Sequence, residues 1–160
     1  MALTADVKII RYGVPGNSTQ PLMPGPIEAS TTLYGGSICL TDSSGNVKSS
    51  ASPSSTDTCW GLVHAQTINA STTVTTGIAL DVNGRPFEVE TGTFFLASAT
   101  GADALGQTYV GKTVYVYNEV TVAATNGSNT RPAAGVLVCI DTTQGGGYAV
   151  KLGSNESTGA

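Results

Sequence analysis

The chain has 160 residues, the size of one domain, and only 11% of them are charged, with a formal net charge of -4 at pH 7. An acidic chain without a Lys or Arg cluster lacks the electrostatic footprint of nucleic-acid binding, and no apolar stretch reaches the length of a membrane span. We therefore expect neither nucleic acid nor a membrane as a partner. So few charges favour a surface that packs against other proteins.

Residues 1–29 differ in composition from the rest of the chain and predict an extended arm. Four of the seven prolines lie between Pro15 and Pro26, and proline excludes a helix or an interior strand. The segment also carries apolar side chains that a free tail would not need, so we expect the arm to lie against another surface. The candidate interface residues of this arm are Val7, Ile9, Arg11, Tyr12, Pro15, Leu22, Met23, Pro24 and Ile27.

From residue 30 onward, short β-branched and aromatic runs alternate with turn residues. Asn83-Gly84 between alternating runs is a strong hairpin signal, and Gly35-Gly36 indicates a bulge or tight bend. A single helical turn is conceivable near 102–105. We expect strands over 31–40, 60–68, 78–82, 86–90, 93–97, 113–117, 120–124, 134–141 and 148–152, the last two as a closing pair. This spacing predicts an all-β fold, a compact barrel or sandwich of short antiparallel strands over 30–153, followed by a polar tail at 154–160.

Residues 106–113 match the phosphate-binding pattern G-x-x-x-x-G-K-[ST], with Gly106, Gly111, Lys112 and Thr113 at its fixed positions. Such a loop must follow a buried strand and open a helix, because the N-terminal amides of that helix face the phosphates. Here a small-residue loop precedes the pattern, and the alternating run 114–122 that follows it is typical of a strand. We therefore interpret the match as a turn into a strand, without a nucleotide site.

The other chemically capable side chains also favour ordinary structural roles. The 3 cysteines lie in or beside apolar runs without the spacing of zinc ligands, which predicts reduced, buried thiols. His64 is the single histidine, and we expect a surface or hydrogen-bonded residue of a strand. Glu88 and Glu90 share one strand face and could form an acid–base pair, but their alternation with apolar neighbours favours a solvated outer face. We expect no catalytic residue, no metal site and no cofactor.

Several segments resemble, in order along the chain, the capsid decoration (cement) proteins of tailed bacteriophages. The opening 1–7 with Arg11-Tyr12-Gly13 is similar to the N-terminal arm of that family, and 28–37 to its first barrel strand. Later segments resemble its G-h-A, G-x-F and G-K-x-V-Y-V strands and its closing strands; they are 60–65, 90–94, 110–116, 131–138 and 148–153. The stretch 13–27 and the serine-rich loop 48–57 are less typical of the family.

The resemblance implies a structural virion protein without enzymatic activity, which binds the outer surface of the expanded capsid and stabilises it. The implied partners are the major capsid protein and further copies of this chain in a homotrimer. The implied location is the outer capsid surface, after assembly in the cytoplasm of a bacterial host. Two alternatives stay open: a β-sandwich module of a phage tail or fibre that recognises cell-surface sugars, and a nucleotide-binding enzyme.

Overall fold

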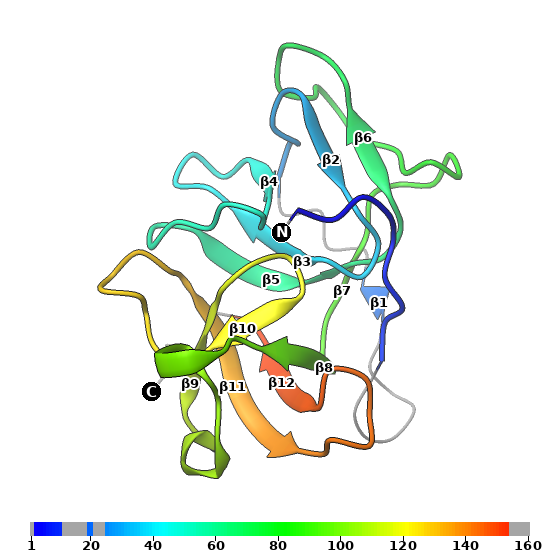
Figure 1. Cartoon of the computed structure of the whole chain (residues 1–160). Helices are drawn as coiled ribbons and strands as arrows, with labels where there is room; N and C mark the ends of the chain where they lie inside the picture. The colour runs from blue at the N-terminus through cyan, green and yellow to red at the C-terminus, as the bar shows by residue number, and fades with distance from the viewer. Residues whose placement is uncertain (1, 11–18, 21–24, 154–160) are drawn as a thin grey trace.

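The computed structural model describes residues 2–10, 19–20 and 25–153, and nearly all of its regular structure is β-strand (Figure 1). The two exceptions among these residues are single 3-10 turns, η1 (Gly101–Asp103) and η2 (Gln107–Tyr109). The prediction of a compact all-β fold is confirmed.

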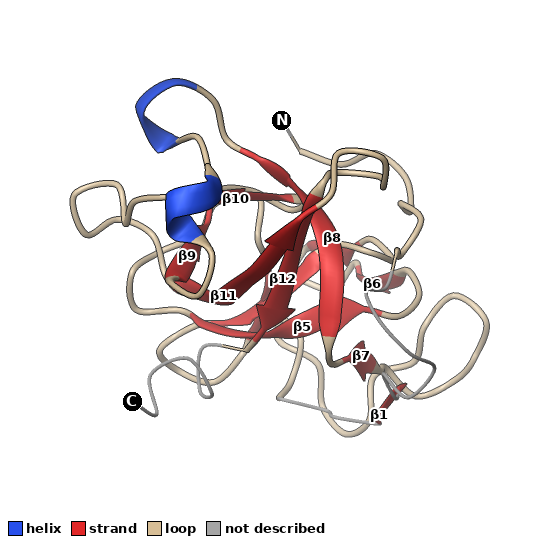
Figure 2. Cartoon of the chain, turned by 90° about the horizontal axis from the view of Figure 1, so that it is seen from below, coloured by secondary structure: helices blue, strands red, loops and turns tan. Residues whose placement is uncertain are grey.

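A closed five-stranded barrel forms the lower half of the molecule in Figure 1 and is viewed from below in Figure 2. The strands run in the order β10-β8-β12-β11-β9, and every neighbouring pair is antiparallel except β10–β8. Closure leaves none of these five strands at a free edge of the barrel. The strands are β8 (Thr93–Ser98), β9 (Thr113–Val116), β10 (Thr121–Ala123), β11 (Ala133–Ile140) and β12 (Tyr148–Leu152).

A second sheet crosses above the barrel in the order β1-β7-β5-β3-β4, and a small sheet of β2 and β6 caps the upper end (Figure 1). Both sheets are antiparallel. Their strands are β1 (Thr19–Gln20), β2 (Thr31–Leu33), β3 (Ile38–Thr41), β4 (Val47–Ser49), β5 (Thr58–Val63), β6 (Thr67–Asn69) and β7 (Val89–Glu90).

Two hydrophobic cores lie on opposite sides of the second sheet. In β3 and β5, Leu40 and Leu62 face the barrel core, which also contains Phe94 and Leu137. The neighbouring residues of the same strands, such as Cys39 and Val63, belong to the upper core with Phe87 and Val89. Because successive strand residues point to opposite faces, this sheet is apolar on both sides and joins the two halves.

Three predicted elements differ from the structure. The strand expected over 31–40 is divided into β2 and β3 by a turn, in which Ser37 N donates to Tyr34 O at 3.1 Å. The strand expected over 60–68 is likewise divided into β5 and β6. The turn at Asn83-Gly84 is present, and its flanks share the bridge between Leu80 and Pro86 and backbone hydrogen bonds from Asp81 N to Arg85 O and from Phe87 N to Ala79 O. They do not form a strand pair, and β7 pairs with β5 and β1 instead.

Candidate functional site: the docked N-terminal arm

The N-terminal arm, defined here as residues 2–10, has no regular secondary structure and lies across both halves of the molecule (Figure 1). Near its middle, Val7 N donates to Gly35 O at 2.8 Å, and Gly35 N donates to Asp6 Oδ1 at 2.7 Å. At its far end, Phe95 N in β8 donates to Ile10 O at 2.8 Å. The arm therefore bridges the turn after β2 and the barrel.

The beginning of the arm is held by a buried carboxylate. The backbone amide of Leu3 donates to Glu119 Oε2, and Ser49 Oγ donates to Glu119 Oε1 at 3.2 Å. Glu119 is only 2% exposed, and a carboxylate is costly to bury unless it accepts hydrogen bonds. The arm thus supplies one of the donors that this buried group requires.

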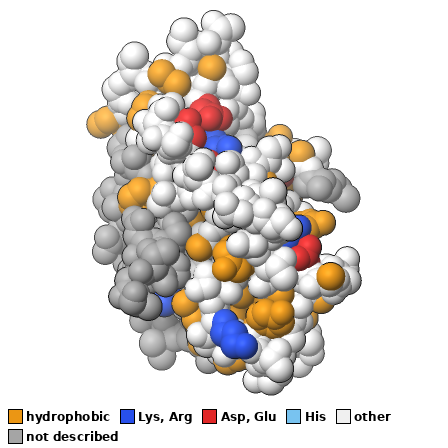
Figure 3. Space-filling view, turned by 90° about the vertical axis from the view of Figure 1, so that its left-hand side faces the viewer, with side chains coloured by type: hydrophobic (Ala, Val, Ile, Leu, Met, Phe, Trp, Pro, Cys, Tyr) orange, Lys and Arg blue, Asp and Glu red, His pale blue; other side chains and the backbone are white. Residues whose placement is uncertain are grey.

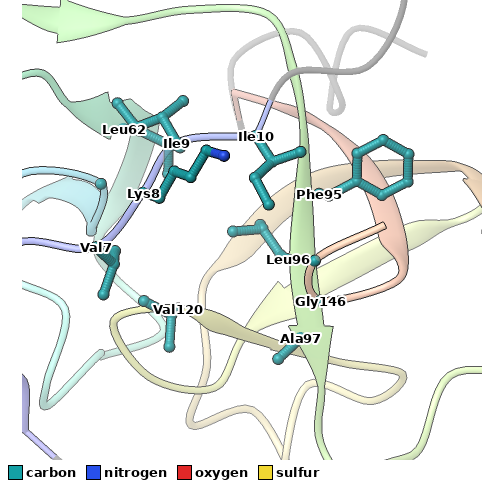
Figure 4. Close-up of a pocket in the computed structure, with 12 residues that line it drawn as sticks. Val7, Lys8, Ile9, Ile10, Leu62, Phe95, Leu96, Ala97, Val120 and Gly146 are labelled. Carbon is teal, nitrogen blue, oxygen red and sulfur yellow. The ribbon is translucent and has the colours of Figure 1, made fainter. Parts of the chain in front are cut away.

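Apolar side chains of the arm cover a cavity of about 180 Å³ between the arm and the barrel (Figure 4). Ile9 also packs against the barrel core. Val7 and Ile10 from the arm also line this cavity, together with Leu62, Phe95 and Val120 from the body. This cavity is partly open to solvent, and its walls are largely apolar.

Gly36 allows the arm to approach closely. Its φ is +83°, and a Cβ added there would lie 2.3 Å from Val7 O and 2.6 Å from Val7 Cγ2. Any larger residue would displace the arm at this point. The glycine pair predicted a bend at this position, but nothing in the local pattern indicated which segment packs against it.

The structure separates the predicted interface residues into three groups. Val7 and Ile9 are half-buried against the body of their own chain. Ile27 is fully buried, accepts a hydrogen bond from Asn69 Nδ2 at 3.1 Å and belongs to the upper core, so it is not a free surface residue. The remaining predicted residues lie outside the described part of the chain; they are Arg11, Tyr12, Pro15, Leu22, Met23 and Pro24.

The arm was expected to extend to residue 29, but chain segments before that point are built into the body. Val47 N donates to Pro26 O at 2.7 Å, and Glu28 N donates to Val47 O at 2.9 Å. Thr19–Gln20 form the edge strand of the second sheet. The body therefore begins no later than Pro26, because backbone pairing with β4 starts there.

The loop that matches the phosphate-binding pattern leads into a strand, as predicted. The amide of Gly111 donates to Leu137 O at 2.7 Å and that of Lys112 to Tyr109 O at 2.9 Å, so both are used within the protein. Thr113 opens β9, whereas a phosphate loop needs a helix there. Lys112 is exposed, with its Nζ 5.6 Å from the centre of the Tyr109 ring. The absence of nucleotide binding stays a prediction.

Glu90 does not lie on a solvated face, contrary to expectation. It is 2% exposed, and its Oε1 lies 3.3 Å from Nδ1 of the half-exposed His64. The alternation with Phe87 and Val89 was interpreted correctly for those two side chains, which are fully buried. It failed for Glu90, whose carboxylate is buried beside the imidazole of His64.

The cysteines are free, and Cys39 and Cys59 are buried as predicted, whereas Cys139 is half-buried. Burial raises the pKa of the Cys59 thiol to about 12, and burial with the neighbouring Cys59 also raises the pKa of Cys39. These thiols stay protonated near neutral pH and are poor nucleophiles.

Within the described ranges, no group of three or more His, Cys, Asp or Glu side chains is placed to hold a metal ion. The same residues contain no helix that is long and apolar enough to cross a membrane. No protein-family model, no curated protein and no solved structure matches the chain.

Proposed function

We propose that this chain is a structural virion protein that binds the outer surface of an expanded bacteriophage capsid and stabilises it. The ordered family resemblance suggests this role, and the feature that best supports it is the N-terminal arm. The arm reaches across both halves of the body through a few backbone hydrogen bonds and apolar contacts. Extended segments of this kind can bind a partner through main-chain pairing and pockets for side chains.

In this proposal the major capsid protein is the partner of the arm. Val7 and Ile9 supply apolar contacts, and the extended backbone can pair with an exposed strand or loop of the partner. Copies of the chain in a homotrimer would present several arms to one capsid. Multivalent attachment holds firmly even where each contact is weak.

The low charge of the surface agrees with a protein that is packed among others. Charged side chains are few among the described residues on the face shown in Figure 3, where most of the described surface is backbone or side chains that are neither charged nor hydrophobic. Interface centres are depleted of charged residues in the same way. An acidic outer-surface protein also has no need to contact packaged DNA, which agrees with the net charge of -4.

The test is to locate the protein on virions. Negative-stain images of particles assembled with a C-terminally labelled chain should show label distributed over the capsid. Label on tails or fibres alone would refute the capsid proposal and favour the sugar-binding tail module.

A further inference from the structure

The exposed hydrophobic residues of this chain are concentrated in one region. Seven large hydrophobic side chains are well exposed in the described residues, and five of them lie between positions 68 and 82. We call these five the neutral ridge; their exposed fractions are 51% for Ile68, 42% for Val74, 64% for Ile78, 55% for Leu80 and 56% for Val82. The other two are Tyr117 and Val138, on the barrel side of the molecule.

In the ridge, apolar side chains face solvent and a charged side chain faces inward, which is the reverse of the usual arrangement in a surface strand. Along 78–82 the three large apolar residues point outward at alternate positions, while Ala79 packs against the upper core and Asp81 is only 9% exposed. The Asp81 side chain is turned inward because its Oδ1 accepts hydrogen bonds from the amides of Asn83 and Arg85 at 2.8 and 3.1 Å. Because successive side chains alternate in direction, these hydrogen bonds of Asp81 leave the apolar side chains on either side of it facing solvent.

Hydrogen bonds hold the parts of the ridge together. Val82 N donates to Gln66 O at 2.8 Å, which fixes the segment 78–82 beside the start of β6. Within β6, Ile68 points outward between two buried neighbours, Thr67 and Asn69. Asn69 Nδ2 donates to Thr73 O at 2.9 Å, so the chain next to Val74 also stays close to β6.

Charge is absent from most of this surface. The run of residues 65–80 contains no Lys, Arg, Asp, Glu or His. Two copies of a chain with a net charge of -4 repel one another, and this repulsion is smallest where neither copy presents charge. The ridge therefore offers a surface over which copies of this chain can meet with few like charges placed together.

The extent of the ridge suits a contact between subunits. Five aliphatic side chains left about half in water expose on the order of 500 Å², near the upper end of apolar patches on monomers. Two such surfaces facing each other would remove on the order of 1,000 Å² from water, about the minimum for a specific interface. The β2–β6 sheet lies at the end of the molecule opposite the barrel (Figure 1). A contact there therefore leaves accessible the part of the arm that lies along the barrel.

We propose that the neutral ridge is the surface by which this chain binds further copies of itself, with the ridges of the subunits facing a common symmetry axis. The contact is apolar, centred on Leu80 and Ile78, and forms without any capsid. It rests on the proposed function in that it names the surface for the self-association included there, and it can be tested separately from capsid binding.

The experiment is sedimentation equilibrium of the full chain and two variants in the absence of capsids. Leu80→Glu places a charge in the ridge, and Val138→Glu introduces the same charge at an exposed barrel residue as the matched control. We expect the native chain and Val138→Glu to form the same oligomer, and Leu80→Glu to dissociate at least about tenfold more readily. Ile78→Ser, which adds no charge, should weaken the oligomer in the same direction.

Thermal unfolding of each variant identifies any loss of fold, which is not expected because all three side chains are more than a third exposed. A native chain that remains monomeric at tens of micromolar would overturn the proposal, as would equal dissociation of Leu80→Glu and Val138→Glu. If Leu80→Glu dissociates the oligomer but the native chain does not bind capsids, the ridge proposal stands and the proposed function fails.

Discussion

Replacing Gly36 with alanine should release the N-terminal arm while the β-sheets stay folded. The new Cβ would lie 2.3 Å from Val7 O, compared with an ordinary contact of at least 3.4 Å, so the arm must move by about 1 Å. A shift of this size breaks the hydrogen bond from Val7 N to Gly35 O and disturbs the packing of Ile9.

The magnitude follows from three separate costs. An alanine held at a φ near +83° is strained by about 1 kcal/mol in any surroundings. Loss of one net hydrogen bond contributes about 1 kcal/mol more. Partial exposure of one aliphatic side chain adds about 1 kcal/mol again. The contact with the arm should therefore make Gly36→Ala about 2 kcal/mol more destabilising than the backbone strain alone.

Gly45 offers a matched control, because its φ is also +83° but no atom lies within 4 Å of an added Cβ. Gly36→Ala and Gly45→Ala should be compared by urea unfolding, both in the full chain and in a chain lacking residues 1–10. Hydrogen exchange at the amides of Val7 and Gly35 reports arm release directly. The reasoning is refuted if the two variants are equally stable in the full chain, or if the difference persists without the arm.

Two further outcomes are expected. Burial raises the pKa values of Cys39 and Cys59 above the ordinary thiol value of 9.0, so their contribution to stability is complete below pH 9 and is lost as the pH rises toward the folded pKa values. Urea unfolding should therefore show a loss of up to about 1.4 kcal/mol of unfolding free energy per thiol per pH unit. A double Cys→Ala variant with the same alkaline slope would contradict this. Thermal shift titration with ATP and magnesium should give no saturable shift for the native chain, because the amides of Gly111 and Lys112 are used internally; a shift abolished by Lys112→Ala would restore the nucleotide hypothesis.

The strands that sequence patterns located best are those of the barrel. β9, β11 and β12 are runs rich in apolar residues between turn residues, and β11 pairs with β12 as predicted. The closure of the barrel was beyond local patterns, because it depends on a parallel pairing of β10 with β8, which joins Thr121 to Ala97. No short-range signal encodes such a pairing.

The arm could be predicted as a segment but not as a set of contacts. Its composition indicated an extended chain that covers a surface, and Val7 and Ile9 do cover the body of their own chain. Glu119 was missed because an isolated acidic residue between two strands gives no sign of burial. Ile27 lies in the upper core, because the proline-rich composition extends past the point where pairing with β4 begins.

The proposed function depends on whether this chain recognises the mature capsid lattice. Co-sedimentation with emptied, expanded heads tests this directly, with unexpanded shells as the control. We expect saturable binding to expanded heads and little binding to unexpanded shells. No binding to expanded heads, or equal binding to both kinds of shell, would contradict the proposal.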